Sequence, residues 1–492
     1  MTFSSSIWLV TTGYLAISLC IGVWASSLGQ SSYEHYTIGD KKLRYWHIMF
    51  TFFATSFGAG NILGNADKAY KVGLPWLAYI FGAQGSKIVF ALCLVGFLAR
   101  YRYKSLAEFT NEIIVRDRVT RIFSALLLCA PCIAWTGAQA MGVGLLFKYF
   151  TGTDPTLVII ITAAVFILYT TIGGMEAVVW TDLFQGVLIS FLALFYYYFA
   201  FKAINFDFAF LARELRSIDP LLWDLGQINW IKTLNLFLTA AMGTVVLQVF
   251  WQRCFAAEKP AEARNGMIFT GVLAMVFVSC TALAGMIVRV MNPELSTGVG
   301  AWMMKELLPQ WAALLMFVFL IAATMSTADS NLNSAAVCIM NDIILPFCPE
   351  MSDKMKIRLT MGITVSIGIF AVLGTMYFKY IMDFVNFAYT IAGGTLCPLV
   401  IVGLLWKKDK RAPFSHENCR VTPMASKVSL IVGSAVAILF STVPEMKGFF
   451  GGGVIPAGLV TTGLLFLVSS LGRDRSPVEL KESEFKTPLL EE

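Results

Sequence analysis

Residues 321–336, IAATMSTADSNLNSAA, carry a series of polar side chains at the end of a strongly apolar run. Ala323, Ser326, Thr327 and Ser330 follow the spacing i, i+3, i+4 and i+7, so on a helix they line one seam. Oxygen atoms gathered at one point are the ligands that a small hard cation takes. The stretch therefore predicts a cation site. The alternative is that each hydroxyl only donates back to its own helix.

A second stretch, ATSFGAGNILGNA at 54–66, has the composition of a helix that is interrupted inside a membrane. Its clustered glycines weaken the helix and free backbone carbonyls. Interrupted helices commonly form transporter binding sites, although small residues also allow helices merely to pack closely. At 1.5 Å per residue, Ser326 and Ala54 lie ~18 Å and ~14 Å from the same membrane face, so the two polar stretches are at matching depth.

The elements that position these residues are predicted to be transmembrane helices. Of the 492 residues, 57% are hydrophobic and 14% are charged, and apolar runs of about 20 residues, the length of one bilayer crossing, recur along the chain. A soluble α/β protein is excluded because it would show amphipathic periods and more charge. We predict an all-α polytopic membrane protein of about 13 transmembrane helices, at 6–27, 45–64, 74–99, 119–149, 155–173, 180–202, 230–252, 265–290, 310–338, 357–377, 380–406, 425–444 and 453–471.

The distribution of lysine and arginine predicts how the chain is oriented. Most of these residues, Arg253 among them, fall in segments that would be cytoplasmic if the N-terminus lies outside. The positive-inside bias therefore favours an N-out, C-in orientation. The net charge of +6 then reflects membrane topology rather than nucleic-acid binding. We expect a single transmembrane domain over 1–472 and a polar cytoplasmic tail over 473–492.

Three separated motifs resemble the sodium/solute symporter family, whose members carry sugars, proline, sialic acid, pantothenate, monocarboxylates or choline. They are IGGMEAVVWTDLFQ at 172–185, WQRCFAAEKPAEARNG at 251–266 and AATMSTADSNLNSA at 322–335. The resemblance implies a LeuT-like core of two inverted five-helix repeats, helices 2–6 and 7–11. In such a core helices 2 and 7 would be the interrupted pair.

The same resemblance implies the ligands of a main sodium site. By matching motif, these are the backbone carbonyls of Ala54, Phe57 and Ala323 with the hydroxyls of Ser326 and Thr327. Because both hydroxyls are present, sodium coupling is expected.

Some family members resemble a two-sodium pattern, and the matching positions here are Asp182 and Ser330, with Asp329 beside them. Asp182 could instead cap the start of its helix, where a carboxylate is favourable. Asp329 stands where the clearest two-sodium relatives have a hydroxyl, so both alternatives remain open.

In such a fold the solute lies near the membrane midplane, between helices 2, 3, 4, 7 and 11. This placement predicts contacts from Asn61, Gln84 and Trp135, each of which could instead be a packing residue.

Lys87 most needs an explanation, because a lysine at its depth costs ~2.5–3.5 kcal/mol on insertion scales. We predict that it binds an anionic group of the solute, pairs with a carboxylate such as Asp329 or Asp182, or reaches toward the membrane surface.

Together these features predict a sodium-coupled symporter that imports a small polar organic solute by alternating access. It would lie in a plasma membrane or bacterial inner membrane, with sodium ions, solute and lipid as partners and no obligatory protein partner. The alternatives are a proton-coupled carrier of the same fold and a transporter-like nutrient sensor. An enzyme is disfavoured, because the sequence has no histidine-based nucleophile constellation and no GxxxxGK[ST] loop.

Overall fold

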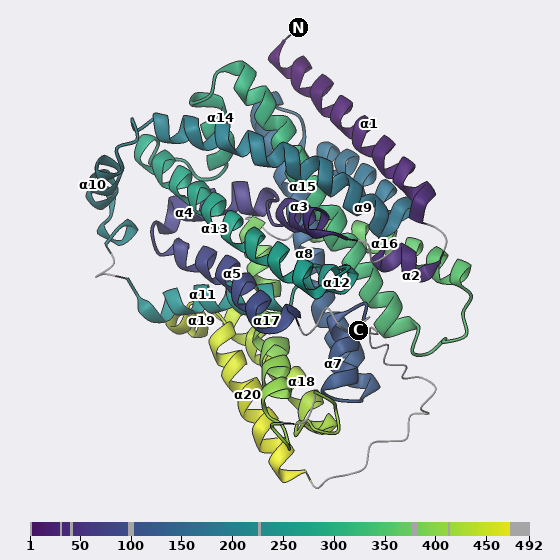
Figure 1. Ribbon diagram of the computed structural model, residues 1–492. Helices are drawn as coiled ribbons and strands as arrows, with labels where there is room; N and C mark the ends of the chain where they lie inside the picture. The colour runs from purple at the N-terminus through teal and green to yellow at the C-terminus, as the bar shows by residue number, and fades with distance from the viewer. Residues whose placement is uncertain are drawn as a thin grey trace.

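Regular secondary structure in the described part of the chain is helical, apart from two isolated bridges between single residues (Figure 1). The computed structural model describes residues 2–29, 32–39, 43–96, 103–224, 228–375, 381–411 and 414–472. The predicted polar tail, 473–492, lies outside these residues.

Helices in the first half of the described chain include both long spans and short interrupted pieces. They are α1 (Phe3–Gly29), α2 (Tyr33–Ile38), α3 (Tyr45–Thr55), η1 (Gly60–Gly64), α4 (Asn65–Val72), α5 (Trp76–Phe90), η2 (Ala91–Val95), α7 (Leu106–Ile113), α8 (Arg118–Thr151), α9 (Pro155–Lys202), α10 (Phe208–Ile218) and η3 (Pro220–Leu222).

The second half follows the same pattern. Its helices are α11 (Trp230–Val245), α12 (Gln248–Ala256), α13 (Pro260–Met291), α14 (Val299–Glu306), α15 (Gln310–Cys338), η5 (Ile339–Ile344), α16 (Asp353–Gly374), α17 (Ile381–Leu405), α18 (Pro423–Thr442), α19 (Pro444–Phe450) and α20 (Val454–Leu471).

Eleven helices among the described residues are long and apolar enough to cross a membrane. Two features account for the difference from the predicted 13. The 48 residues of α9 would extend ~72 Å if straight, more than twice the apolar thickness of a bilayer, but the helix is bent at Gly174, where φ is 57°. The predicted helix at 45–64 is divided between α3 and η1, with α4 following directly, and none of the three is long enough alone. The count of 13 stays a prediction.

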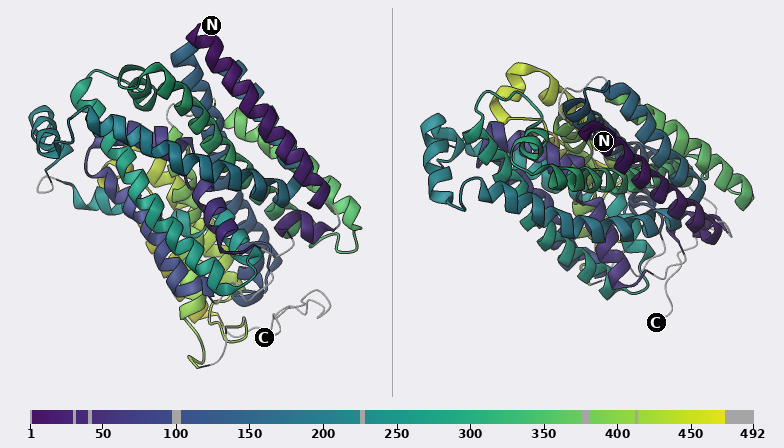
Figure 2. Two further views of the ribbon diagram at one scale, coloured as in Figure 1. Left: turned by 45° about the horizontal axis from the view of Figure 1, so that its top comes forward. Right: turned by 90° about the horizontal axis from the view of Figure 1, so that it is seen from above.

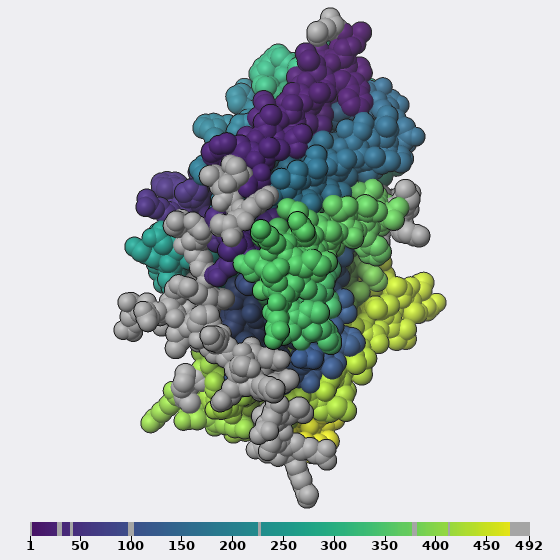
Figure 3. Space-filling view, turned by 90° about the vertical axis from the view of Figure 1, so that its right-hand side faces the viewer, coloured from purple at the N-terminus to yellow at the C-terminus, as the bar shows by residue number. Residues whose placement is uncertain are grey.

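The outer surface of the helices is apolar, as contact with lipid requires. Leu9, Phe191 and Leu459 expose 59%, 66% and 68% of their surface. In Figure 3, α1, α9 and α16 lie over the upper and middle parts of one face, and Figure 2 shows α1 lying along α9 from two further sides. Soluble monomers rarely expose apolar surface on this scale. The chain is therefore a multi-pass membrane protein.

The interior is organised around α15. Every residue from Ile321 to Cys338 is buried, and α15 packs against α8, α9, α1, α3 and α12. The polar side chains of this helix therefore face protein rather than lipid.

Two helices are interrupted beside α15, and they are the two that the sequence predicted. In the first, α3 ends at Thr55 and η1 begins at Gly60. In the second, α11 ends at Val245 and α12 begins at Gln248. Backbone groups are thus free of regular helical pairing at both points.

A polar cluster joins α7, the start of α8 and η5 at one end of the bundle. Arg121 Nε donates to Asp342 Oδ1 at 2.9 Å, and Asn341 Nδ2 donates to Glu108 Oε2 at 3.2 Å. Glu112 lies in the same cluster. Burial raises the pKa of Glu112 to about 7, with Arg121 opposing the shift and Glu108 adding to it.

The raised pKa of Glu112 makes stability depend on pH. The folded protein holds the Glu112 proton more tightly than the unfolded chain does. The contribution of this proton to the stability of the folded protein is therefore complete below pH 4.5 and is lost as the pH rises through about 7. We expect Glu112→Gln, which is neutral throughout, to gain stability relative to the unchanged protein between pH 5 and pH 8. Unfolding temperatures of both proteins across this range test the expectation. Parallel curves would contradict it.

Candidate functional site

The break after α3 is shaped by glycines that let two neighbouring helices approach closely. A Cβ at Gly58 would collide with the Thr327 hydroxyl on α15, and a Cβ at Gly60 would collide with the Trp135 ring on α8. Within the break, Phe57 N donates to Ala54 O at 3.1 Å in a tight turn. The break therefore sits directly against α15.

The residues predicted for the main sodium site lie on these two elements, and all five are buried. Thr327 Oγ1 donates to Thr55 O across the break at 3.0 Å and to Ala323 O of its own helix at 3.1 Å. Ser326 lies beside the Asp182 carboxyl, but its buried hydroxyl completes no hydrogen bond of good geometry within the described residues. Back-bonding to the helix thus applies to Thr327 only.

The role of Arg253 was missed by sequence reasoning. The residue was expected in a cytoplasmic loop, but it lies on α12 with none of its surface exposed. Its Nη2 donates to Asp182 Oδ2 at 2.9 Å and to Ser330 Oγ at 2.6 Å. On the α3 side, Nη2 donates to Thr55 Oγ1 at 3.0 Å and Nε to Thr51 Oγ1 at 2.8 Å. The guanidinium is therefore held by three other helices.

Asp182 and Ser330, predicted for a second sodium site, are brought together by this contact. Ser330 Oγ lies 3.2 Å from Asp182 Oδ2. The helix-cap alternative for Asp182 is wrong, because its side chain binds Arg253, Ser330 and Thr51 in the middle of α9 rather than backbone amides at a helix start.

Asp329, the third residue of that predicted site, makes its hydrogen bonds elsewhere. Its Oδ2 accepts from Tyr169 OH at 2.7 Å and from Thr181 Oγ1 at 3.3 Å. Asp182 Oδ1 and Asp329 Oδ1 are both buried without a hydrogen-bond partner among the described residues. Two carboxylates and one guanidinium leave one formal negative charge in excess.

Lys87 is buried and bound to neutral groups. Its Nζ donates to Ser56 Oγ at 2.8 Å and to Gln84 Oε1 at 2.9 Å, and it lies 4.6 Å from the centre of the Phe250 ring. The predicted ion pair with Asp182 or Asp329 is wrong, since those carboxylates bind other partners. Extension to the membrane surface is also wrong, because Lys87 is 4% exposed.

One cavity gathers all four residues predicted to contact solute. Its volume is only about 30 Å³, so the cavity must widen to admit an organic solute. Its lining comes from both interrupted helices and from α5, α8, α15 and α17: Thr55, Ser56, Asn61, Tyr79, Ala83, Gln84, Lys87, Trp135, Thr244, Leu247, Phe250, Thr327, Asn331 and Tyr389.

Two of the predicted residues also brace the cavity wall. Asn61 Nδ2 donates to Ser56 O at 2.5 Å, which holds the break closed on itself. Trp135 Nε1 donates to Tyr389 OH at 2.9 Å and so joins α8 to α17. These two side chains can therefore hold the helices together and also contact the solute. No local sequence pattern marks Tyr389, because its position depends on the packing of distant helices.

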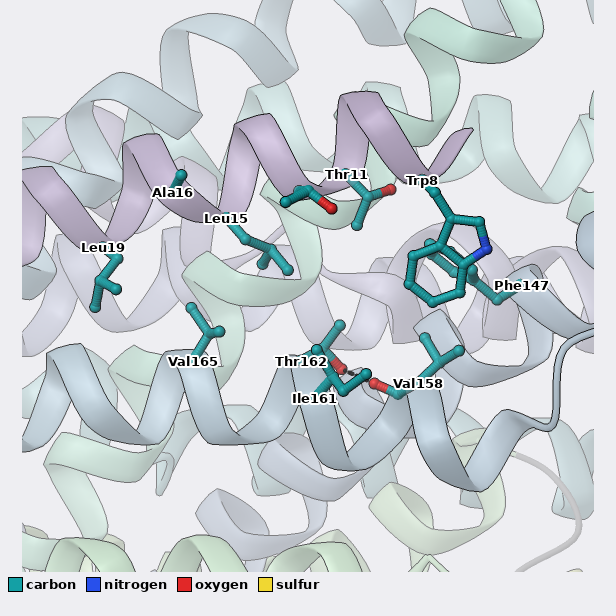
Figure 4. A pocket seen from close by; sticks show the side chains of 11 residues that line it. Trp8, Thr11, Leu15, Ala16, Leu19, Phe147, Val158, Ile161, Thr162 and Val165 are labelled. Atoms are coloured by element: carbon teal, nitrogen blue, oxygen red, sulfur yellow. Dashed lines mark hydrogen bonds between the residues drawn. The ribbon is translucent and has the colours of Figure 1, made fainter. Parts of the chain in front are cut away.

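A larger cavity of about 270 Å³ lies between α1 and α9 (Figure 4). Trp8, Leu15 and Leu19 face Val158 and Val165 across it. Its lining has no ionisable side chain. Since its lining is mainly apolar and carries no charge, the smaller cavity beside α15, which gathers amide, hydroxyl and ammonium groups, is the better candidate site.

Known proteins resemble the chain along most of its length. A family model described as "Sodium:solute symporter family" matches residues 36–412. The sodium/sialic acid symporter NanT of Aliivibrio fischeri is 20% identical over 94% of this chain and 93% of its own. The sodium/sialic acid symporter SiaT of Proteus mirabilis is 24% identical over 95% of this chain and 97% of its own.

Solved structures show the same arrangement of helices. A substrate-bound, outward-open sodium-coupled sialic acid symporter has a TM-score of 0.79 at 21% identity, with 96% of this chain and 99% of that chain covered. MhsT in complex with L-phenylalanine has a TM-score of 0.54 at 14% identity, with 86% and 98% covered. The fold is therefore an all-helical, LeuT-like transporter fold.

Proposed function

Because the chain belongs to the sodium:solute symporter family and is a sodium-coupled symporter of a small organic solute, we propose that sodium binds where the break after α3 meets α15. The ligands would be the carbonyls of Ala54, Phe57 and Ala323 with the hydroxyls of Ser326 and Thr327. The observation that carries this proposal is the buried Ser326 hydroxyl, which lies beside an interrupted helix and completes no hydrogen bond of good geometry within the part of the chain that the structure describes. A bound cation would satisfy it.

Coupling follows from residues that belong to both sites. Thr327 reaches across the break to Thr55 O and also lines the cavity. Ser56 lies in the break and holds Lys87 at the cavity wall. An ion that orders these side chains also prepares the solute site, so each ligand raises the affinity for the other. Asn61, Gln84, Lys87 and Trp135 are the proposed solute contacts.

The remaining architecture is proposed from the same family. The core consists of two inverted five-helix repeats, helices 2–6 and 7–11 of about 13, with an N-out, C-in orientation. The two interrupted helices support the repeat, because they stand at matching positions of its halves. The transmembrane domain covers 1–472, and 473–492 is a cytoplasmic tail. The protein would lie in a plasma membrane or bacterial inner membrane.

The excess negative charge around Asp182 and Asp329 supports a second cation. We infer that a second sodium ion binds between Asp182 Oδ1, Asp329 Oδ1 and Ser330, since both carboxylate oxygens are buried without a hydrogen-bond partner among the described residues. A proton on Asp329 is the alternative, and it would make the carrier proton-coupled. A sodium ion and a proton would each neutralise the one excess negative charge of the Asp182, Asp329 and Arg253 group.

A stoichiometry measurement separates these alternatives. We expect Asp329→Asn to reduce the sodium ions moved per solute from two to one, measured as the accumulation that a fixed sodium gradient sustains in liposomes. Glu445→Gln, on the exposed α19, is the control and should change nothing. Unchanged sodium stoichiometry with lost pH dependence of uptake would assign the second cation as a proton.

Uptake into liposomes tests the proposed function as a whole. A sodium gradient should drive solute accumulation, and potassium at equal ionic strength should not. Ser326→Ala should abolish the difference between the two ions. Solute binding that requires sodium, without any accumulation, would instead indicate a nutrient sensor.

A further inference from the structure

Among the described residues, the charge on Lys87 has no carboxylate partner. Of the described residues that line the cavity, none is aspartate or glutamate. Its hydrogen-bond partners, Ser56 and Gln84, are neutral. The carboxyl of Asp182, on α9, is bound instead to Arg253.

A buried ammonium group is unfavourable unless an opposite charge balances it. Two neutral hydrogen bonds and the face of the Phe250 ring compensate only part of the lost hydration. An ion that arrives with the transported solute can complete the balance. The unpaired lysine thus points to the charge of that solute.

The rest of the cavity limits the form that the solute can take. Tyr79, Trp135, Phe250 and Tyr389 supply aromatic surface, and Leu247 adds apolar surface. A single lysine acts as a point charge, whereas phosphate is usually bound by arginine forks or clusters of backbone amides. A carboxylate attached to a small apolar body fits this combination.

We propose, on the basis of the function proposed above, that the solute is a small organic monocarboxylate. Its carboxylate accepts hydrogen bonds from Lys87 Nζ, and its apolar body lies against the aromatic wall formed by Tyr79, Trp135, Phe250 and Tyr389.

This arrangement also provides a source of coupling. Ser56 belongs to the break where sodium is proposed to bind, and it accepts a hydrogen bond from Lys87. The proposed sodium ion and the Lys87 ammonium group would lie close together in a poorly hydrated interior, where like charges repel each other. A carboxylate between them removes the repulsion, so sodium and the anion strengthen each other's binding by the same factor.

Matched pairs of ligands test the charge requirement on the full-length protein. Butyrate and butyramide, and benzoate and benzamide, differ mainly in charge. We expect the carboxylates to raise the unfolding temperature in sodium but not in potassium, and the amides to have little effect in either. Equal stabilisation by acid and amide would overturn the proposal. Stabilisation by iodide alone would show that the solute is an inorganic anion rather than an organic carboxylate.

Lys87→Met tests the residue itself. Loss of one partner of a buried charge pair predicts carboxylate affinity weaker by on the order of 30-fold. Sodium binding without solute should become as tight or tighter, because the repulsion is gone; a purely structural role would not produce this gain. Lys87→Arg should recover part of the carboxylate affinity. Lys148→Met, at the exposed end of α8, should match the unchanged protein.

The outcomes separate this proposal from the proposed function. If Lys87→Met keeps the preference for acid over amide, Lys87 is a structural residue, and sodium-dependent binding of another solute still supports the symporter. If sodium stabilises neither the unchanged protein nor any complex, the sodium site itself is wrong. The matched ligand pairs decide the charge requirement even if a lysine variant fails to fold.

Discussion

Arg253→Met is expected to destabilise the protein more than any other single substitution considered above. It would leave Asp182 buried with a neighbouring carboxylate, Asp329, and no counter-charge. Removing one partner from a buried ion pair typically costs about 3–5 kcal/mol. The effect should appear as a large fall in unfolding temperature in detergent and as poor recovery of folded protein.

A double substitution distinguishes charge from lost packing. Asp182→Asn combined with Arg253→Met removes both charges and should recover part of the stability. Lys427→Met is the comparison, because Lys427 pairs at 3.3 Å with Asp117 in a partly exposed position. Such pairs contribute at most about 1 kcal/mol. An Arg253 variant no less stable than the Lys427 variant would contradict the central role of the buried pair.

Ser326→Ala and Thr327→Ala are expected to remove sodium dependence, the second large effect. Each deletes one proposed oxygen ligand from a site that is built only from neutral oxygens. Substitutions that merely support a metal ligand typically weaken binding 10–100-fold, so loss of a ligand should weaken sodium affinity by at least about tenfold. Sodium titrations of the unfolding temperature measure this directly.

Two further variants sharpen the sodium test. Thr327→Ser keeps the oxygen and should keep most of the sodium affinity. Ser366→Ala deletes an exposed hydroxyl on α16 that donates only to its own helix, at Gly362 O, and should have no effect. Sodium affinity unchanged in Ser326→Ala would show that this hydroxyl is not a ligand.

Much of the candidate site could be predicted because its signals are local. Polar residues on an apolar helix, and glycines clustered in another, are visible in short stretches of sequence. The structure confirms the interruption at 56–59 and brings Asn61, Gln84, Lys87 and Trp135 to one cavity.

The Arg253 network could not be predicted, for a physical reason. Arginine next to a polar segment normally indicates a loop, and only tertiary packing shows that α12 turns inward. The partners of Arg253 come from α3, α9 and α15 and lie between 71 and 202 residues away from it along the chain. The partner of Asp329, Tyr169, is equally distant along the chain. Contacts between residues so far apart in sequence cannot be recognised from the pattern of any single segment.

The bonds of Arg253 also bear on how tightly transport is kept free of leaks. If α12 moves away from α3 and α15, the guanidinium must leave Thr51, Thr55, Asp182 and Ser330 together, because a partial separation strands charge without water. We therefore expect half-open forms to be sparsely populated and separation of α12 from α3 and α15 to be close to all-or-none. Such a transition should leave few partly open forms through which an ion could leak.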